Sequence, residues 1–141
     1  MINIYLCDDE PQVVSKYKYL IKRYALSRSL DINIETFERG EELLFHLEDH
    51  VSTPDIIFMD IFMDELNGIE TSKRIRELGI NAFIIFLTTT SDFVFEAFDV
   101  RSFNYLVKQD TDEARFREVL GNVINQVEKH APDFFDCSFG S

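Results

Sequence analysis

Short apolar runs rich in β-branched and aromatic residues alternate with amphipathic stretches along nearly the whole chain. Such runs are typical of buried strands, whereas apolar residues spaced three and four apart form one face of a helix. The pattern predicts strands at residues 2–7, 32–37, 55–59, 82–87 and 105–107. It predicts a helix from Pro11 to about residue 24, with Asp9 as candidate cap, and helices at 41–47, 69–78, 92–100 and 116–127.

This alternation restricts the fold class. Strands that are apolar on both sides and joined by helices form a parallel sheet with helices on both of its faces. We therefore expect a doubly wound α/β domain with a five-stranded parallel sheet in the common, flavodoxin-like order 2-1-3-4-5. A chain of 141 residues with 45% hydrophobic side chains is long enough for one such packed domain. We place this domain at residues 1–128.

Charge and cysteine content exclude several function classes. The chain has 26 Asp and Glu against 14 Lys and Arg, a net charge of −12, so we expect no direct contact with nucleic acid. Cys7 and Cys137 lie at opposite ends without CxxC spacing, which predicts neither a disulfide framework nor a zinc site. No apolar run approaches the roughly 18 residues of a membrane span, and no basic signal sequence is present. We expect a cytoplasmic protein without membrane contact.

Acidic residues follow two of the predicted strands. Asp8 and Asp9 come directly after the first strand, and Asp60 follows the third. In the order 2-1-3-4-5 these two strand ends flank the crevice where ligands of open α/β sheets bind. Carboxylates packed so closely repel one another unless they are protonated or neutralised, and oxygen ligands suit a hard dication. The sequence therefore predicts a Mg²⁺ site.

The next two strands end in residues that can bind an anion. Thr88 follows the fourth strand with a hydroxyl donor, and Lys108 follows the fifth with an ammonium group. Each residue alone has an ordinary interpretation, as a helix cap or a solvated charge. Together with the acids they indicate a place where a phosphoryl group is held. Asp60 is the candidate acceptor, because a carboxylate can attack phosphorus to give an aspartyl phosphate.

Over about residues 1–128, the sequence resembles the receiver domains of two-component response regulators. The motifs CDDEP, MDIFMDELNGIE, FLTTT and FNYLVK carry the resemblance, in that order along the chain. The resemblance implies that Asp60 accepts a phosphoryl group from a sensor histidine kinase. It also implies that Mg²⁺ is bound by Asp8, Asp9, Asp60 and the backbone carbonyl of Phe62.

The resemblance further implies a switch rather than an enzyme. Thr88 is the expected switch hydroxyl, Tyr105 the switch aromatic residue, and Lys108 the partner of the phosphoryl group. Phosphorylation would shift a two-state equilibrium and alter protein contacts. The predicted helix 92–100 has scarcely any polar face, so part of it is expected to be exposed. By analogy with the family we expect a homodimer through this helix, the strand 105–107 and the helix 116–127.

Gln109 departs from the family pattern, and Phe62 bears on the lifetime of the acyl phosphate. Gln109 follows Lys108, where most relatives carry a proline with a cis peptide bond. A non-proline cis bond costs about 3 kcal/mol, so we expect either a trans bond with a rearranged loop or a strained bond. Phe62, two residues beyond Asp60, has no polar group to orient an attacking water. We therefore expect at most slow autodephosphorylation.

The tail, residues 129–141, ends in the stretch DFFDCSFGS, which is aromatic and non-helical in pattern. Its FFDCSFGS segment resembles the opening strand of the LytTR class of DNA-binding output domain. We interpret the tail as the linker and first strand of such a domain in a bacterial transcription regulator. The alternative is a stand-alone receiver with a disordered tail.

Three other functions remain as alternatives. A haloacid-dehalogenase-type phosphatase also forms an aspartyl phosphate, but it needs a second acid where this chain has Phe62. A flavin-binding electron carrier shares the strand order, but Asp8, Asp9 and Glu10 would repel the flavin phosphate. A degenerate receiver would act purely as an interaction module, which the complete set of acids, hydroxyl and lysine disfavours.

Overall fold

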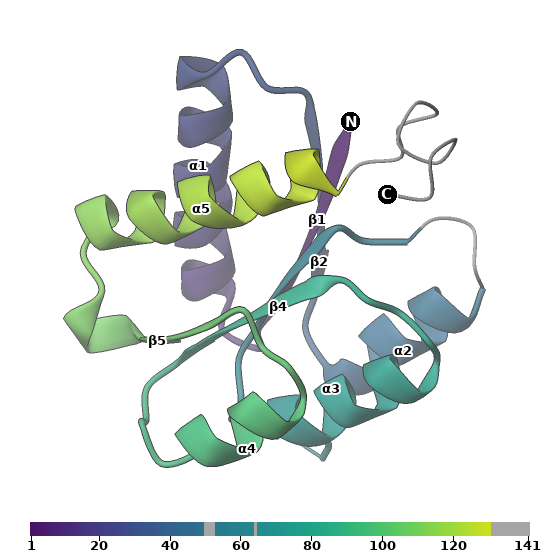
Figure 1. Cartoon of the computed structure of the whole chain (residues 1–141). Coiled ribbons are helices and arrows are strands. Elements are labelled where there is room, and N and C mark those ends of the chain that lie inside the picture. The colour runs from purple at the N-terminus through teal and green to yellow at the C-terminus, as the bar shows by residue number, and fades with distance from the viewer. Residues whose placement is uncertain (50–52, 64, 131–141) are drawn as a thin grey trace.

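The computed structural model describes residues 1–49, 53–63 and 65–130. Five parallel strands form one sheet in the order β2-β1-β3-β4-β5, which confirms the predicted fold class. The strands are β1 (Ile2–Cys7), β2 (Ile32–Phe37), β3 (Ile56–Met59), β4 (Phe83–Thr88) and β5 (Asn104–Val107). The helices are α1 (Pro11–Ser27), α2 (Gly40–Glu48), α3 (Gly68–Glu77), α4 (Val94–Asp99) and α5 (Glu113–Lys129), with a 3₁₀ turn at Lys108–Asp110 (Figure 1).

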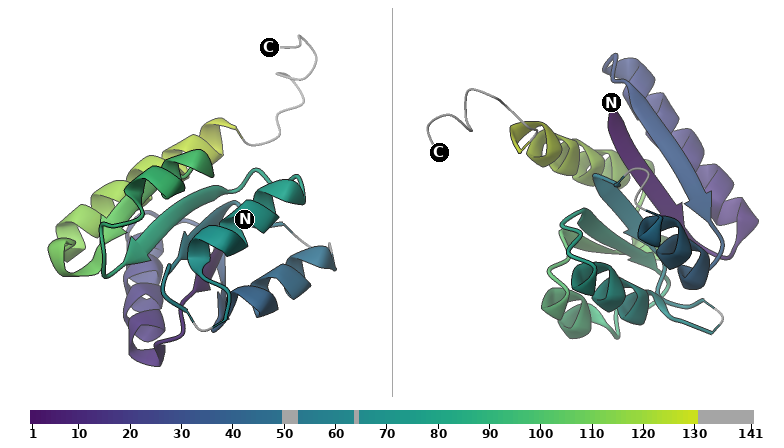
Figure 2. Two further views of the ribbon diagram at one scale, coloured as in Figure 1. Left: turned by 90° about the horizontal axis from the view of Figure 1, so that it is seen from below. Right: turned by 90° about the vertical axis from the view of Figure 1, so that its right-hand side faces the viewer.

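The helices cover the two faces of the sheet in separate layers. Helices α1 and α5 pack on one face and α2, α3 and α4 on the other, as the views in Figure 2 show. Successive residues of a strand point to opposite faces. Ile4 and Leu6 of β1 therefore join the α1/α5 core, whereas Tyr5 and Cys7 join the core under the other three helices. This explains why the strands had to be apolar on both sides.

The first residues of α1 differ from the prediction. Asp9 is not the cap of this helix: the capping position is Glu10, whose side chain makes no capping hydrogen bond. The Glu10 amide instead donates to Asp8 Oδ1 at 2.9 Å. This bond holds the Asp8 side chain at the end of β1, and the start of the helix relies on Pro11.

Two other helices differ in length from the sequence prediction. Helix α4 covers only Val94–Asp99, because the Asp92 amide bonds to Thr90 Oγ1 in a turn that precedes the helix. Helix α5 begins earlier than predicted, at Glu113, because Asp112 caps it by accepting a hydrogen bond from the Arg115 amide.

The structure describes no helix that is both long and apolar enough to cross a membrane. The tail from residue 131 onward lies outside the described residues. Its interpretation as a linker and first strand, and the domain boundary at residue 128, remain predictions.

Candidate functional site

Two carboxylates are placed side by side by the pairing of the central strands. Cys7 and Met59 are partners in the parallel ladder between β1 and β3, so Asp8 and Asp60 follow at the same edge of the sheet. The Asp60 amide also donates to the Cys7 carbonyl at 3.0 Å. The side chains of both aspartates are buried, with only 3% and 5% of Asp8 and Asp60 exposed. Burial makes their charge costly, so neutralisation is needed.

Asp9 completes a group of three acids. Asp8, Asp9 and Asp60 each offer one carboxylate oxygen, and these oxygens lie within 4.8 Å of one another. The structure thus brings together the three acids that the sequence singled out. A set of oxygen donors at this spacing fits a hard dication such as Mg²⁺.

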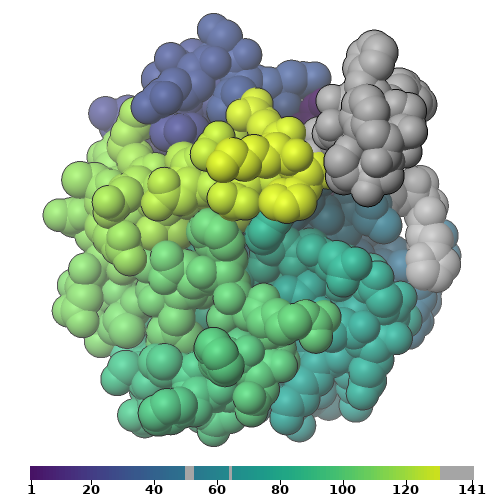
Figure 3. All heavy atoms as spheres, viewed as in Figure 1, coloured from purple at the N-terminus to yellow at the C-terminus, as the bar shows by residue number. Residues whose placement is uncertain are grey.

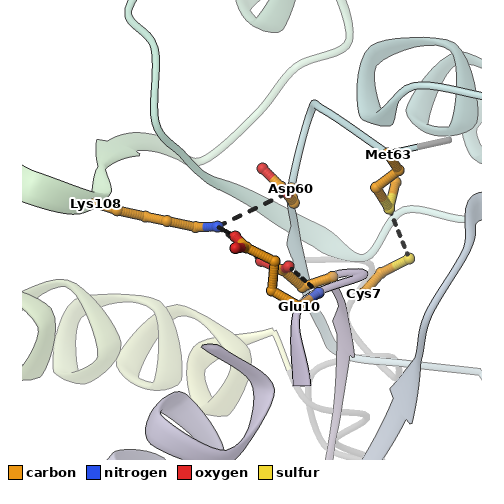
Figure 4. A network of polar contacts seen from close by, with 6 residues as sticks. Cys7, Glu10, Asp60, Met63 and Lys108 are labelled. Carbon is orange, nitrogen blue, oxygen red and sulfur yellow. Dashed lines mark hydrogen bonds and ion pairs between the residues drawn. The ribbon is translucent and has the colours of Figure 1, made fainter. Parts of the chain in front are cut away.

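Lys108 reaches this acidic group from the end of β5. Its Nζ lies 2.9 Å from Asp8 Oδ2, 3.8 Å from Asp60 Oδ2 and 3.6 Å from Glu10 Oε1. Figure 4 shows the side chain of Lys108 pointing toward the carboxylates of Glu10 and Asp60. Only 12% of the lysine side chain is exposed. The ammonium therefore supplies a fixed positive charge within the site.

The carboxylates and the lysine shift one another's titration. Burial and the charge of Asp8 raise the pKa of Asp60 to about 6, although Lys108 and the nearby hydroxyl of Thr88 act in the opposite direction. Burial alone would lower the pKa of Lys108. Its hydrogen bond to Asp8 and the charge of Asp60 outweigh burial, so the pKa lies above its ordinary value. Lys108 is charged at neutral pH.

The hydroxyl of Thr88 is buried at the end of β4, next to the acids in the sheet order. Within the described part of the chain its Oγ1 makes no hydrogen bond of ordinary geometry. A buried hydroxyl without a partner is costly, and an anion bound beside Asp60 would provide one. Thr88 is the last residue of β4, so its hydroxyl lies at the same edge of the sheet as Asp60.

Tyr105 of β5 anchors the segment that follows β4. Its hydroxyl donates to the Thr90 carbonyl at 2.6 Å, and its ring packs against Phe86 with centroids 6.0 Å apart. Burial raises the pKa of the phenol above its ordinary value. The ring is partly buried in the core under α4, so Tyr105 connects β5 to the loop that follows Thr88.

The Lys108–Gln109 bond follows the first of the two expected alternatives. No peptide bond is cis among the residues that the structure describes. The segment Lys108–Asp110 forms a 3₁₀ turn, and Gln109 Nε2 donates to the Thr89 carbonyl at 2.9 Å. The rearranged turn still directs Lys108 into the acidic group.

Sequence reasoning missed the role of Gly68 at the start of α3. A Cβ at this position would lie 2.1 Å from the Asp60 carbonyl oxygen, and the Gly68 amide donates to the Ile61 carbonyl at 2.9 Å. Only glycine permits this close approach, which fixes the backbone directly after Asp60. The Asn67-Gly68 pair at the predicted helix start was a signal that could have indicated it.

Two side chains near the acids offer no reactive group. Phe62 is 52% exposed, and its ring meets that of Phe93 edge-on, with centroids 5.7 Å apart. Cys7 is buried beside the acids and contacts Met63 Sδ at 3.6 Å. Burial and the neighbouring charges of Asp8 and Asp60 raise the pKa of its thiol far above the ordinary value, so it stays protonated.

Comparison with known proteins gives a consistent result. A family model described as the response regulator receiver domain matches residues 4–121. The sensory transduction protein LytT of Bacillus subtilis (strain 168) is 28% identical over 120 residues, which are 85% of this chain and 47% of LytT. LytT of Oceanobacillus iheyensis is 30% identical over 125 residues, or 86% of this chain and 48% of that protein. The chain thus spans about half the length of these relatives.

Solved structures have the same fold. The response regulatory domain of protein mrkE from Klebsiella pneumoniae aligns with a TM-score of 0.81 at 24% identity, over 92% of this chain and 100% of that one. The response regulator protein TrrA from Thermotoga maritima, solved in complex with Mg²⁺-BeF, aligns with a TM-score of 0.73 at 26% identity. That alignment covers 87% of this chain and 99% of TrrA.

Proposed function

The chain belongs to the response regulator receiver domain family, and from this premise we propose that it is a phosphorylation switch whose acceptor is Asp60. The observation that carries the proposal is the position of Asp60. Its buried carboxylate shares a site with Asp8 and Asp9 and lies 3.8 Å from the ammonium of Lys108. This arrangement is suited to a nucleophile that must approach another anion.

The phosphoryl donor is a phosphohistidine of a sensor histidine kinase. An oxygen of Asp60 attacks the phosphorus, the P–N bond breaks, and its electron pair stays with the imidazole, which takes up a proton. The product is a mixed anhydride on Asp60. Lys108 lies close enough to move from Asp8 toward the new phosphoryl oxygens, and the buried hydroxyl of Thr88, which makes no hydrogen bond of ordinary geometry among the described residues, supplies a second contact.

Mg²⁺ fits the acidic group and completes the site. Asp8, Asp9 and Asp60 would hold the ion through carboxylate oxygens, together with the backbone carbonyl of Phe62. When bound, the ion screens the charge between the acceptor carboxylate and the incoming phosphoryl group. The TrrA structure, which was solved in complex with Mg²⁺-BeF, supports this assignment by similarity.

The output is a changed protein surface around α4, β5 and α5. Phe95 and Phe98 of α4 are 84% and 80% exposed, so this short helix presents aromatic side chains to solvent as the sequence predicted. In Figure 3 the residues after β4, coloured green to yellow, form one continuous face. Phosphorylation alters this face through Thr88 and Tyr105, and the phosphorylated domain dimerises there.

The chain belongs to a longer bacterial transcription regulator of the LytTR class that works in the cytoplasm. The support is its similarity to LytT proteins, of which it covers about half. In this proposal residues 1–128 are the switch, residues 129–141 lead into the output domain, and nucleic acid is contacted only by the latter. The switch turns over no substrate and at most loses its own phosphoryl group slowly.

Incubation with Mg²⁺ and acetyl phosphate or beryllofluoride tests the proposal. We expect one stoichiometric adduct per chain that disappears in Asp60→Asn. The matched control is Asp31→Asn, an exposed aspartate beside β2, which should leave the adduct intact. Continuous turnover of phosphate esters would instead indicate a phosphatase. Bound flavin would indicate an electron carrier, and an absent adduct an interaction module.

A further inference from the structure

The loop after β4 is held by two side chains at consecutive backbone carbonyls. Gln109 Nε2 donates to the Thr89 carbonyl at 2.9 Å, and the Tyr105 hydroxyl donates to the Thr90 carbonyl at 2.6 Å. Both donors come from β5 or from the turn directly after it. The loop is thus attached to β5 at two adjacent points.

Gln109 is adjacent to Lys108 in a turn that is itself well fixed. Thr111 Oγ1 donates to the Val107 carbonyl at 2.8 Å, and the Thr111 amide donates to the Lys108 carbonyl at 3.3 Å. These bonds close the 3₁₀ turn around Lys108 and Gln109. One side chain of the turn reaches the acids at β1 and β3, and the next reaches the loop after β4. The turn therefore sets the position of the loop relative to the ammonium.

The loop begins directly after Thr88, whose hydroxyl is buried without an ordinary hydrogen bond among the described residues. A donor that is to meet an anion must be held in place before the anion arrives, because ordering it afterwards reduces affinity. If the Thr89 carbonyl lost its partner, the backbone next to Thr88 could rotate toward water. The position of the Thr88 hydroxyl therefore depends on whether the Thr89 carbonyl is held by its hydrogen bond.

We infer that Gln109 is a positioning residue for the phosphoryl group: its amide holds the Thr89 carbonyl so that Thr88 and Lys108 face the same anion. The inference rests on the proposed phosphoryl-acceptor function. Gln109 contacts neither the anion nor the metal, and it acts through the loop. It thereby takes over, by a side-chain hydrogen bond, a restraint on the turn after Lys108 in a chain that has no proline there.

The test is Gln109→Met, which keeps the length of the side chain but removes the donor. We expect beryllofluoride to bind about two- to tenfold more weakly, the range for loss of one hydrogen bond. Mg²⁺ affinity, measured separately by calorimetry, should stay unchanged, because the bond from Gln109 goes to the Thr89 carbonyl and to none of the three acids. Amide exchange at Thr89 and Thr90 should become faster. Gln126→Met on α5 is the same chemical change away from the site and should alter none of these values.

Equal beryllofluoride affinity and equal exchange rates in Gln109→Met and the wild type would overturn the inference. A parallel loss of Mg²⁺ affinity would also overturn it, since that would indicate general damage to the site. If the wild type itself forms no adduct, the phosphoryl-acceptor function fails. If the wild type forms one and Gln109→Met binds equally well, only the positioning role fails.

Discussion

Lys108 Nζ lies 2.9 Å from Asp8 Oδ2 but 3.8 Å from Asp60 Oδ2. The ammonium is thus bonded to one acid of the site and merely close to the proposed acceptor. A phosphoryl group on Asp60 would offer the lysine new oxygens, so the same side chain can serve both states of the site.

Replacement of Lys108 by Met should raise the pKa of the Asp60 carboxyl above its value of about 6, because the nearest cation is removed. Without Mg²⁺ the protein should also lose about 1–3 kcal/mol of stability at neutral pH, since Asp8 is left buried and unpaired. Carbon-detected NMR titration and urea unfolding measure the two effects. Lys129→Met at the exposed end of α5 is the control. An unchanged titration of Asp60 in Lys108→Met would contradict the contact between Lys108 and Asp60.

Asp60→Asn should stabilise the Mg²⁺-free protein at neutral pH. The folded-state pKa of Asp60 is raised from 3.8 to about 6, so the charged carboxylate opposes folding above that range. The gain in the free energy of unfolding should reach at most about 3 kcal/mol at pH 7. It should vanish as the pH falls from about 6 to below 4, where Asp60 of the wild type is protonated in both the folded and the unfolded state. Urea unfolding across this range measures it, with Asp31→Asn as reference. A constant difference between variant and wild type at all pH values would contradict this account.

Phe62 should make the acyl phosphate long-lived. Its side chain has no polar atom to orient water and packs edge-on against Phe93. Phe62→Gln, which adds such an atom, should speed hydrolysis by about tenfold or more. Loss of phosphoryl group from the isolated Mg²⁺-loaded domain, followed over time, gives both rates. Phe103→Leu is the control, because Phe103 directly precedes β5, at the end away from Lys108. A half-life of seconds in the wild type would contradict the prediction.

The exposed aromatic residues of α4 should mediate dimerisation of the activated domain. Phe95→Ser with Phe98→Ser removes the two most exposed rings of the helix. We expect the beryllofluoride-loaded double variant to sediment as a monomer while adduct formation is retained. Phe45→Ser, which removes an exposed ring on α2, should leave the dimer intact. A wild-type adduct that stays monomeric at high concentration would show that this surface has another role.

The strand order and the meeting of Asp8, Asp9 and Asp60 could be predicted from the sequence because they follow from short-range patterns. Apolar runs define the strands, and the residue after each strand must lie at the same edge of a parallel sheet. The details that failed depend on competition between neighbouring hydrogen bonds. Asp9 did not cap α1, because the Glu10 amide bonds to Asp8 instead and the acidic pair stays at the sheet edge.

Contacts between loops were beyond the sequence analysis. The bond from Gln109 to the Thr89 carbonyl joins residues 20 positions apart, and no local pattern indicates it. The close approach of Gly68 to the Asp60 backbone likewise depends on how α3 enters the fold. The sequence alone does not decide between a trans and a strained Lys108–Gln109 bond. The bond is trans, and a 3₁₀ turn accommodates it.

The residue that carries the phosphoryl group can be identified by chemical reduction. The domain is treated with acetyl phosphate and Mg²⁺, the acyl phosphate is reduced with borohydride, and the peptides are sequenced by tandem mass spectrometry. Reduction converts a phosphorylated aspartate to homoserine, so the product marks the acceptor. We predict homoserine at position 60 only, dependent on Mg²⁺. Homoserine at position 8 or 9, or no homoserine in a protein that remains folded, would contradict the assignment of Asp60.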